Sequence, residues 1–254
     1  MKKILFLILF NLFQHANAQN HPENHEKLMD NLASQIKHDT INIGFLLFDG
    51  AVLQDFAGPM EVFSKAKSLS HGKYKTFSIG LENKIIKLDN EMLVVETEYI
   101  LANAPKIDYL IIPGANMKKI EEILANSSLM EKFKKAMSGK NQNIISVCTA
   151  AYLLAKSDML NNKKTTTHFF VAQDFKERFP KVNLITDVRF VEDGNIISSS
   201  GVTSGIDAAL YLVEKLSGQK MRAMINRALQ HDFKIEDKWP VPPNGMRYKM
   251  NNHE

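Results

Sequence analysis

The stretch "NIISVCTAAYLLA", residues 143–155, contains the only cysteine of this 254-residue chain. Residues 143–147 form a short apolar run that is typical of a buried strand, and the small residues after Cys148 favour a helix. A strand that turns abruptly into a helix presents the residue at the turn above the sheet, as in a nucleophile elbow. The stretch therefore predicts a corner that displays the side chain of Cys148.

The predicted position of Cys148 at a helix N-terminus bears on its reactivity. The partial positive charge of a helix N-terminus favours an anion, and the thiolate is the nucleophilic form of cysteine. Backbone N–H groups at the same helix start can hold a developing negative charge. We therefore expect a reactive thiol with a lowered pKa. The pattern leaves one alternative open, which is a cysteine that only fills space in the core.

Strands and helices alternate along the rest of the chain. The predicted strands are 41–48, 74–81, 107–115 and 143–147, with a short β excursion at 84–95, and the predicted helices are 117–125, 127–138, 204–216 and 219–230. This alternation indicates right-handed βαβ units and an α/β fold with a mostly parallel sheet. Ligands of such sheets bind beyond the carboxyl ends of the strands. Asp55, Gly114 and Cys148 each follow a predicted strand, so we expect them at one edge.

Two further side chains are candidates for proton transfer beside the thiol. Asp55 is expected on the loop after the first strand, before a helix whose first turn contains Pro59. It is either a proton donor for the site or a turn and capping residue. His168 follows a predicted strand in "TTTHFF". It is either part of the site or a hydrogen-bonded histidine at a helix start.

The first eighteen residues, "MKKILFLILFNLFQHANA", have the features of a secretory signal peptide. Two lysines precede an apolar run of about ten residues, and "ANA" is a small-residue cleavage pattern. The run is roughly half as long as a bilayer-spanning helix requires. The sequence therefore predicts export to the periplasm or the exterior, with no stable membrane insertion after cleavage.

The remaining 236 residues are expected to contain one domain. Residues 19–40 are polar and are interpreted as a spacer or capping segment, 41–231 as the α/β domain, and 232–254 as a C-terminal tail. The formal charge of +4 falls to +2 once the two leader lysines are removed, and the basic residues are scattered, which argues against a nucleic-acid surface. A single cysteine cannot form a disulfide within its chain, and no histidine spacing suggests a metal site.

Five blocks of this sequence resemble, in order and spacing, the isonitrile hydratase branch of the ThiJ/PfpI superfamily, which is related to class I glutamine amidotransferases. The blocks are "GFLLFDGAVLQDFAGPMEVF", "IDYLIIPGA", "IISVCTAAYLLA", "KTTTHF" and "SSSGVTSGIDAAL", and "QHDFKIEDKWPVPP" is similar to the tail of that branch. The resemblance implies a flavodoxin-like three-layer sandwich with a cysteine on a strained elbow. It also implies a homodimer, a small-molecule substrate and no cofactor.

The resemblance also implies roles for particular residues. Cys148 would attack the terminal carbon of an isonitrile, Asp55 would deliver a proton, and Thr149 would help to place the water that releases a formamide. Relatives that act as proteases often have a catalytic histidine where this chain has Thr149, so the protease interpretation is less favoured. The candidate substrate-binding residues are Gly114, Ala115 and His168.

Three hypotheses follow for function. The leading one is an exported, cysteine-dependent hydratase of small molecules such as isonitriles. The alternative is a redox or electrophile sensor in which the same thiol is oxidised. A third hypothesis, a ligand-binding module like the sensory halves of AraC-type regulators, is less favoured, because we expect an exported chain ending at Glu254 to lack DNA-binding helices.

Overall fold

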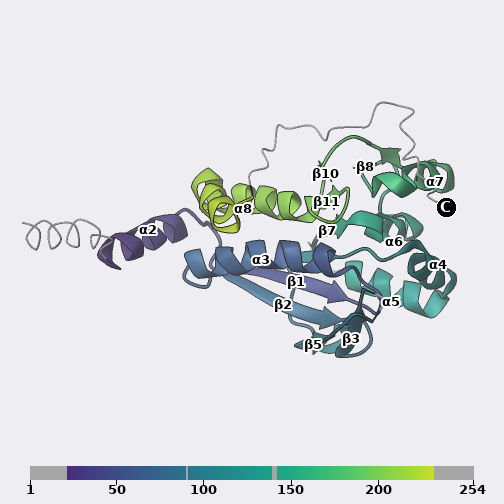
Figure 1. The fold of residues 1–254 in the computed structure, drawn as a ribbon, viewed down its shortest axis with the longest axis horizontal. Helices are drawn as coiled ribbons and strands as arrows, with labels where there is room; N and C mark the ends of the chain where they lie inside the picture. Colours follow the sequence, from purple (N-terminus) through teal and green to yellow (C-terminus); the bar gives the residue numbers. More distant parts are fainter. Residues whose placement is uncertain (1–21, 90, 139–141, 232–254) are drawn as a thin grey trace, which may run out of the picture.

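The computed structural model of the protein describes residues 22–89, 91–138 and 142–231. Its centre is a seven-stranded sheet with the order β10-β11-β7-β6-β1-β2-β5, in which only β10 runs antiparallel to its neighbour (Figure 1). The strands are β1 (Ile41–Leu47), β2 (Tyr74–Gly80), β5 (Tyr99–Ile100), β6 (Tyr109–Ile112), β7 (Asn143–Val147), β10 (Phe190–Asp193) and β11 (Ile196–Ser199). Two smaller sheets pair β3 (Ile85–Leu88) with β4 (Leu93–Glu96) and β8 (Lys164–Thr165) with β9 (Asn183–Leu184).

Helices cover both faces of the large sheet. Right-handed crossovers in opposite directions from β1 and β6 place α3 on one face and α4 with α5 on the other. Helices α3 and α8 pack against each other (Figure 1). The helices are α2 (Pro22–Ser34), α3 (Leu53–Leu69), α4 (Met117–Ala125), α5 (Ser127–Met137), α6 (Ala151–Lys156), α7 (Ala172–Arg178) and α8 (Ser204–Leu229), with 3-10 turns at Leu101–Asn103, Cys148–Ala150 and Phe169–Val171. The predicted α/β fold with a mostly parallel sheet is confirmed.

The central strands β1, β6 and β7 are mostly apolar because helices cover both of their faces. Strand β1 is buried at every residue except the half-buried Asn42. It pairs in parallel with β2 on one side and with β6 on the other. The carboxyl ends of β1, β6 and β7 are therefore neighbours, and the residues that follow them form one edge of the sheet.

Helix α3 begins four residues before the expected start at Ala57. The prediction placed Asp55 on a loop and Pro59 in the first turn, whereas the helix starts at Leu53 and contains Pro59 in its interior. The physical reason is a cap from a distant segment: Asp89 Oδ2 accepts a hydrogen bond from Leu53 N at 2.9 Å. Asp55 is consequently held in the first turn of a helix.

Two helical features lie outside the βαβ pattern. Residues 19–40, interpreted as polar, include α2, and both Leu32 in its last turn and Ile36 just beyond its end are buried in the core. The expected break between helices at 204–216 and 219–230 is confirmed, because Gly218 interrupts α8 with a φ of 82°.

The predicted signal peptide and the predicted C-terminal tail lie outside the described residues. Within the three described ranges, no helix is both long enough and apolar enough to cross a bilayer.

Candidate active site

Cys148 lies at the sharp corner that the sequence predicts. Strand β7 ends at Val147, a 3-10 turn begins at Cys148, and α6 follows directly. Cys148 has a φ of 60°, a left-handed conformation that costs energy for a residue with a side chain. Thr167 Oγ1 donates a hydrogen bond to the Cys148 carbonyl at 3.1 Å and helps to hold the corner. The nucleophile-elbow geometry is thus present.

The carboxyl group of Asp55 shares a buried site with the thiol of Cys148. Asp55 is fully buried and Cys148 is 7% exposed. Asp55 Oδ2 accepts a hydrogen bond from Gly114 N at 3.0 Å. Oδ1 has no partner with full hydrogen-bond geometry among the described residues, although the Val202 N–H and the Cys148 thiol both lie close enough to lower the pKa of the carboxyl group.

Burial dominates the titration of Asp55. It raises the pKa of the carboxyl group from 3.8 to about 7, and the charge of Asp89 acts in the same direction. The N–H groups of Gly114 and Val202 oppose the change but do not cancel it. Asp55 is therefore divided between its acid and carboxylate forms near neutral pH, as a proton-transfer residue must be.

The pKa of the Cys148 thiol shifts in the direction opposite to the one expected from its position at a helix start. Burial, and after it the charge of Asp55, raises the pKa to about 12, and hydrogen bonds from Thr149 and Val202 offset only part of this. Helix α6 has six residues, so its dipole is a weak counterweight. The expectation of a lowered thiol pKa is wrong, and the thiol has to lose its proton as it reacts.

Gly114 and Ala115 contact Asp55 and Thr149. A Cβ atom on Gly114 would come within 2.6 Å of Thr149 Oγ1 and 2.8 Å of Thr149 N, so only glycine fits. Ala115 N donates to Thr149 Oγ1 at 2.9 Å, and the same hydroxyl donates to Ala115 O at 2.7 Å. The structure thus brings the predicted residues together, but it uses Gly114 and Ala115 to hold Asp55 and Thr149 in place.

His168 lies beside the sulfur. A Cβ atom on Gly201 would be 2.7 Å from His168 Cδ2 and 3.3 Å from Cys148 Sγ, so one backbone position touches both side chains. Burial lowers the pKa of His168, which makes the imidazole neutral at pH 7. Its Nδ1 accepts a long hydrogen bond, 3.4 Å, from Phe170 N.

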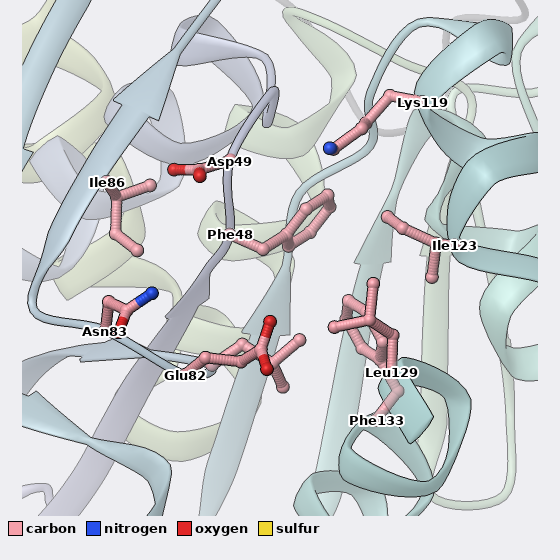
Figure 2. Close-up of a pocket in the computed structure, with 10 residues that line it drawn as sticks. Phe48, Asp49, Glu82, Asn83, Ile86, Lys119, Ile123, Leu129 and Phe133 are labelled. Carbon is pink, nitrogen blue, oxygen red and sulfur yellow. The ribbon is translucent and has the colours of Figure 1, made fainter. Parts of the chain in front are cut away.

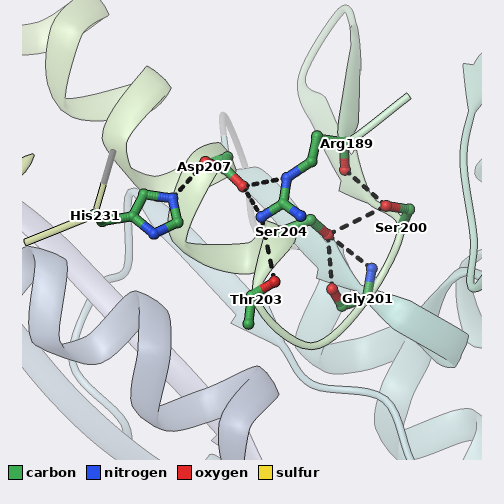
Figure 3. A network of polar contacts seen from close by, with 7 residues as sticks. All are labelled: Arg189, Ser200, Gly201, Thr203, Ser204, Asp207 and His231. Carbon is green, nitrogen blue, oxygen red and sulfur yellow. Dashed lines mark hydrogen bonds and ion pairs between the residues drawn. The ribbon is translucent and has the colours of Figure 1, made fainter. Parts of the chain in front are cut away.

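Sequence reasoning missed the segment that covers the thiol. Residues 200–203 connect β11 to α8, and Gly201 and Val202 lie against Cys148 and Asp55. A buried ion pair between Arg189 and Asp207 supports this segment (Figure 3). The glycine in "SSSGVTSG" could have indicated a close backbone approach. No local pattern distinguishes Arg189 from a surface arginine.

Two hollows open elsewhere on the molecule, and Cys148 lines neither. One, of about 440 Å³, lies beyond β1 and β2 against α4 and α5 (Figure 2). The other, of about 540 Å³, lies between α3 and the two ends of α8. Within the described ranges, no cluster of three His, Cys, Asp or Glu side chains could hold a metal ion.

The chain is similar in sequence to known proteins and similar in fold to solved structures. The chain is 25% identical to isonitrile hydratase of Pseudomonas putida over 80% of this chain and 81% of that enzyme. It is 26% identical to the HTH-type transcriptional regulator GbdR of Pseudomonas aeruginosa over 73% of this chain, but this match spans only 49% of the regulator. A ThiJ/PfpI family protein from Pseudomonas syringae has the same fold, with a TM-score of 0.66, 21% identity and coverage of 81% of this chain and 78% of that one.

These relatives include an enzyme and a regulator, so the fold by itself does not decide between catalysis and ligand sensing. The family assignment has a separate basis. The model of the DJ-1/PfpI family matches residues 42–215, which include β1, the Cys148 corner and the first turns of α8. The chain belongs to the DJ-1/PfpI family.

Proposed function

We propose that the protein is a cysteine-dependent hydratase that converts isonitriles to N-substituted formamides. The observation that carries the proposal is the buried pair of Cys148 and Asp55, in which the carboxyl group has a pKa of about 7. A protonated thiol next to such a group can add to a neutral carbon while its proton is transferred locally. The similarity to isonitrile hydratase of Pseudomonas putida supports the choice of substrate.

In the first half of the reaction, the thiol adds to the terminal carbon of R–N≡C. Asp55 in its carboxylate form takes the proton from Cys148 Sγ as the S–C bond forms, and then delivers that proton to the same carbon. The product is a thioimidate, R–N=CH–S–Cys148. Because the site is buried, no bulk water competes for the proton during this step.

In the second half, water adds to the thioimidate carbon and its proton passes through Asp55 to the nitrogen. The C–S bond then breaks, the hydroxyl proton of the water adduct passes to the sulfur, and R–NH–CHO leaves. Atoms balance as one isonitrile plus one water giving one formamide. Thr149 donates its hydroxyl proton to Ala115 O. We therefore assign Thr149 to holding the thiol and the loop, and its expected role in placing water stays a prediction.

The test is formamide production from simple alkyl and aryl isonitriles by the full-length protein with Cys148 kept reduced. We expect turnover that depends on Cys148 and disappears in Cys148→Ser. A matched control is Ser157→Ala, which removes a hydroxyl that donates a hydrogen bond to the Leu153 carbonyl of α6. Absence of formamide from a folded, reduced protein would overturn the proposal.

The sensor hypothesis is less well supported by the same contacts. Oxidation of cysteine starts from an accessible thiolate, whereas burial raises the pKa of Cys148 to about 12. Intact mass after mild peroxide treatment distinguishes the two functions. Stoichiometric oxygen addition at Cys148 without turnover would favour the sensor.

We also propose that the chain is exported and forms a homodimer. The leader pattern of residues 1–18 supports export. The intact mass of exported material would test it, and we expect the mass of a chain that begins at Gln19.

Exposed apolar side chains on the β3–β4 hairpin support the dimer interface: Ile85, Met92 and Val94 are 55%, 76% and 56% exposed. Sedimentation equilibrium would measure the oligomeric state, and a monomer at micromolar concentration would contradict the dimer.

A further inference from the structure

The segment that covers the thiol has an unfavourable backbone conformation. Gly201 has a φ of 133° and Val202 a φ of 40°, and a β-branched residue rarely adopts the latter value. A conformation of this kind persists only where surrounding contacts fix it. The segment lies directly on the sulfur, because a Cβ atom on Gly201 would be 3.3 Å from Cys148 Sγ.

Arg189 contacts the segment in two places (Figure 3). Its carbonyl accepts a hydrogen bond from Ser200 N at 2.9 Å, and its Nη2 donates to Thr203 Oγ1 at 3.3 Å. Gly201 and the strained residue Val202 lie between these two contacts. The side chain of Arg189 therefore connects the end of the segment, at Thr203, to the partners of its guanidinium group.

Asp207 on α8 fixes that guanidinium group. Arg189 Nε donates to Asp207 Oδ2 at 2.6 Å, Nη2 reaches the same oxygen, and the two side chains are only 6% and 2% exposed. The second carboxylate oxygen, Oδ1, lies 2.7 Å from His231 Nε2. A buried ion pair with a further partner holds its geometry far more tightly than a surface pair does.

We propose that Arg189 and Asp207 are positioning residues that hold Gly201 and Val202 over Cys148, so that this segment shields the sulfur from water and directs the Val202 N–H toward Asp55. Neither residue is expected to touch substrate. The inference concerns the site of the proposed hydratase. Its test, however, measures the thiol directly and does not require turnover.

Two opposing effects follow when the segment is released. Loss of the Val202 N–H would raise the pKa of the thiol, whereas entry of water would lower it. Burial is the largest cause of the raised pKa of Cys148, and the Val202 contact is among the smallest. Release should therefore lower the pKa of the thiol and speed its reaction with alkylating reagents at neutral pH.

The experiment is the rate of Cys148 alkylation by iodoacetamide between pH 6 and pH 10 in the full chain. For Asp207→Asn we expect a rate at pH 7 that is about tenfold higher, equivalent to a decrease of about one pKa unit. Thr203→Val removes the hydrogen bond from Arg189 Nη2 to Thr203 Oγ1 and keeps the ion pair, so it should raise the alkylation rate less. Glu214→Gln is the control, because it breaks an ion pair with Arg222 on the same helix, away from the thiol.

Asp207→Asn leaves Arg189 buried without its counter-ion, and this could unfold the chain. The double variant Arg189→Met with Asp207→Leu removes both charges and should fold while showing the same faster alkylation. An alkylation pH profile identical to that of the wild type, in a folded Asp207→Asn or double variant, would overturn the proposal. A loss of stability alone, with an unchanged profile, would show that the ion pair is only structural.

Discussion

The carboxyl edge of the sheet contains two contrasting regions, the open hollow beyond β1 and β2 and the closed site around Cys148. The charged side chains Glu82 and Lys119 line the hollow (Figure 2). Each is paired in solvent with a residue outside the lining: Lys119 Nζ lies 3.3 Å from Glu122 Oε2, and Glu82 pairs with Lys132. At the closed site, Asp55 has no such exposure, and its pKa rises to about 7.

The two regions differ in burial, and only the closed site changes the ionisation of its carboxyl group strongly. Exposed ion pairs contribute little because water screens them, whereas burial changes which form of a side chain is stable. The closed site also contains left-handed backbone at Cys148 and Val202. Strained backbone and a buried carboxyl group both lower the stability of the fold, so the surrounding contacts must hold this site in place.

Removal of the thiol should have the largest effect on the closed site. Cys148→Ser should reduce formamide production by about a thousandfold or more, since the hydroxyl of serine is a far weaker nucleophile. Its thermal unfolding midpoint should change little, because the side chain keeps its shape. An unfolded variant would instead indicate that Cys148 serves packing.

Removal of the charge beside the thiol should have the next largest effect. Asp55→Asn should lower turnover by about 10²- to 10⁴-fold, the usual contribution of a general acid or base. It should also lower the pKa of Cys148, because the charge of Asp55 is one cause of the raised value. Steady-state kinetics and alkylation rates measure the two effects. Unchanged turnover would remove Asp55 from the mechanism.

The same substitution should stabilise the fold above neutral pH. The pKa of Asp55 is higher in the folded protein than its model value of 3.8, so its ionisation opposes folding. This penalty is absent below pH 3.8, develops as the pH rises to 7 and is complete above pH 7. The free energy of unfolding of Asp55→Asn, relative to that of the wild type, should therefore be up to about 4 kcal/mol larger at pH 8 than at pH 4. Urea unfolding at the two pH values measures this difference. A constant difference across that range would contradict the raised pKa.

One added carbon at the closed site should matter more than a large side chain at the hollow. Gly114→Ala should destabilise the protein by about 1–3 kcal/mol, because the new methyl group would overlap the Thr149 backbone. Turnover should fall by about 10- to 100-fold as Asp55 and Thr149 move. Kinetics and thermal unfolding of the purified variant measure both effects, and wild-type behaviour would show that the packing around Thr149 is loose.

Filling the hollow should have the smallest effect. Leu129→Trp places an indole among the side chains that line it and should change turnover by no more than about twofold, the range expected for a change remote from the site. A large loss of formamide production, with the fold intact, would mean that substrate uses the hollow and would reverse the comparison.

Much of the architecture could be predicted from local patterns. The apolar run at 143–147 and its small-residue continuation correspond to β7 and the Cys148 corner. The predicted helices at 117–125 and 127–138 match α4 and α5 to within one residue. These elements follow from periodicity and turn chemistry within a few neighbouring residues.

The parts that could not be predicted depend on contacts between distant segments. Asp89 extends α3 backward to Leu53, and this places Asp55 on a helix. Burial raises the pKa of Cys148, and one residue that lies against its sulfur, Gly201, is over fifty positions away in the sequence. A helix start alone suggested the opposite direction, since a local pattern contains no information on burial.

The central claim is that the carboxyl group of Asp55 ionises near neutral pH beside a buried thiol that stays protonated. Because the chain has a single cysteine, ¹³Cβ-cysteine labelling gives one NMR signal, whose chemical shift can be followed from pH 5 to pH 10. We predict a small shift centred near pH 7, when Asp55 ionises, and no complete conversion to thiolate by pH 10. A full thiolate transition at or below about pH 8.5, the value of a free cysteine, would contradict the account.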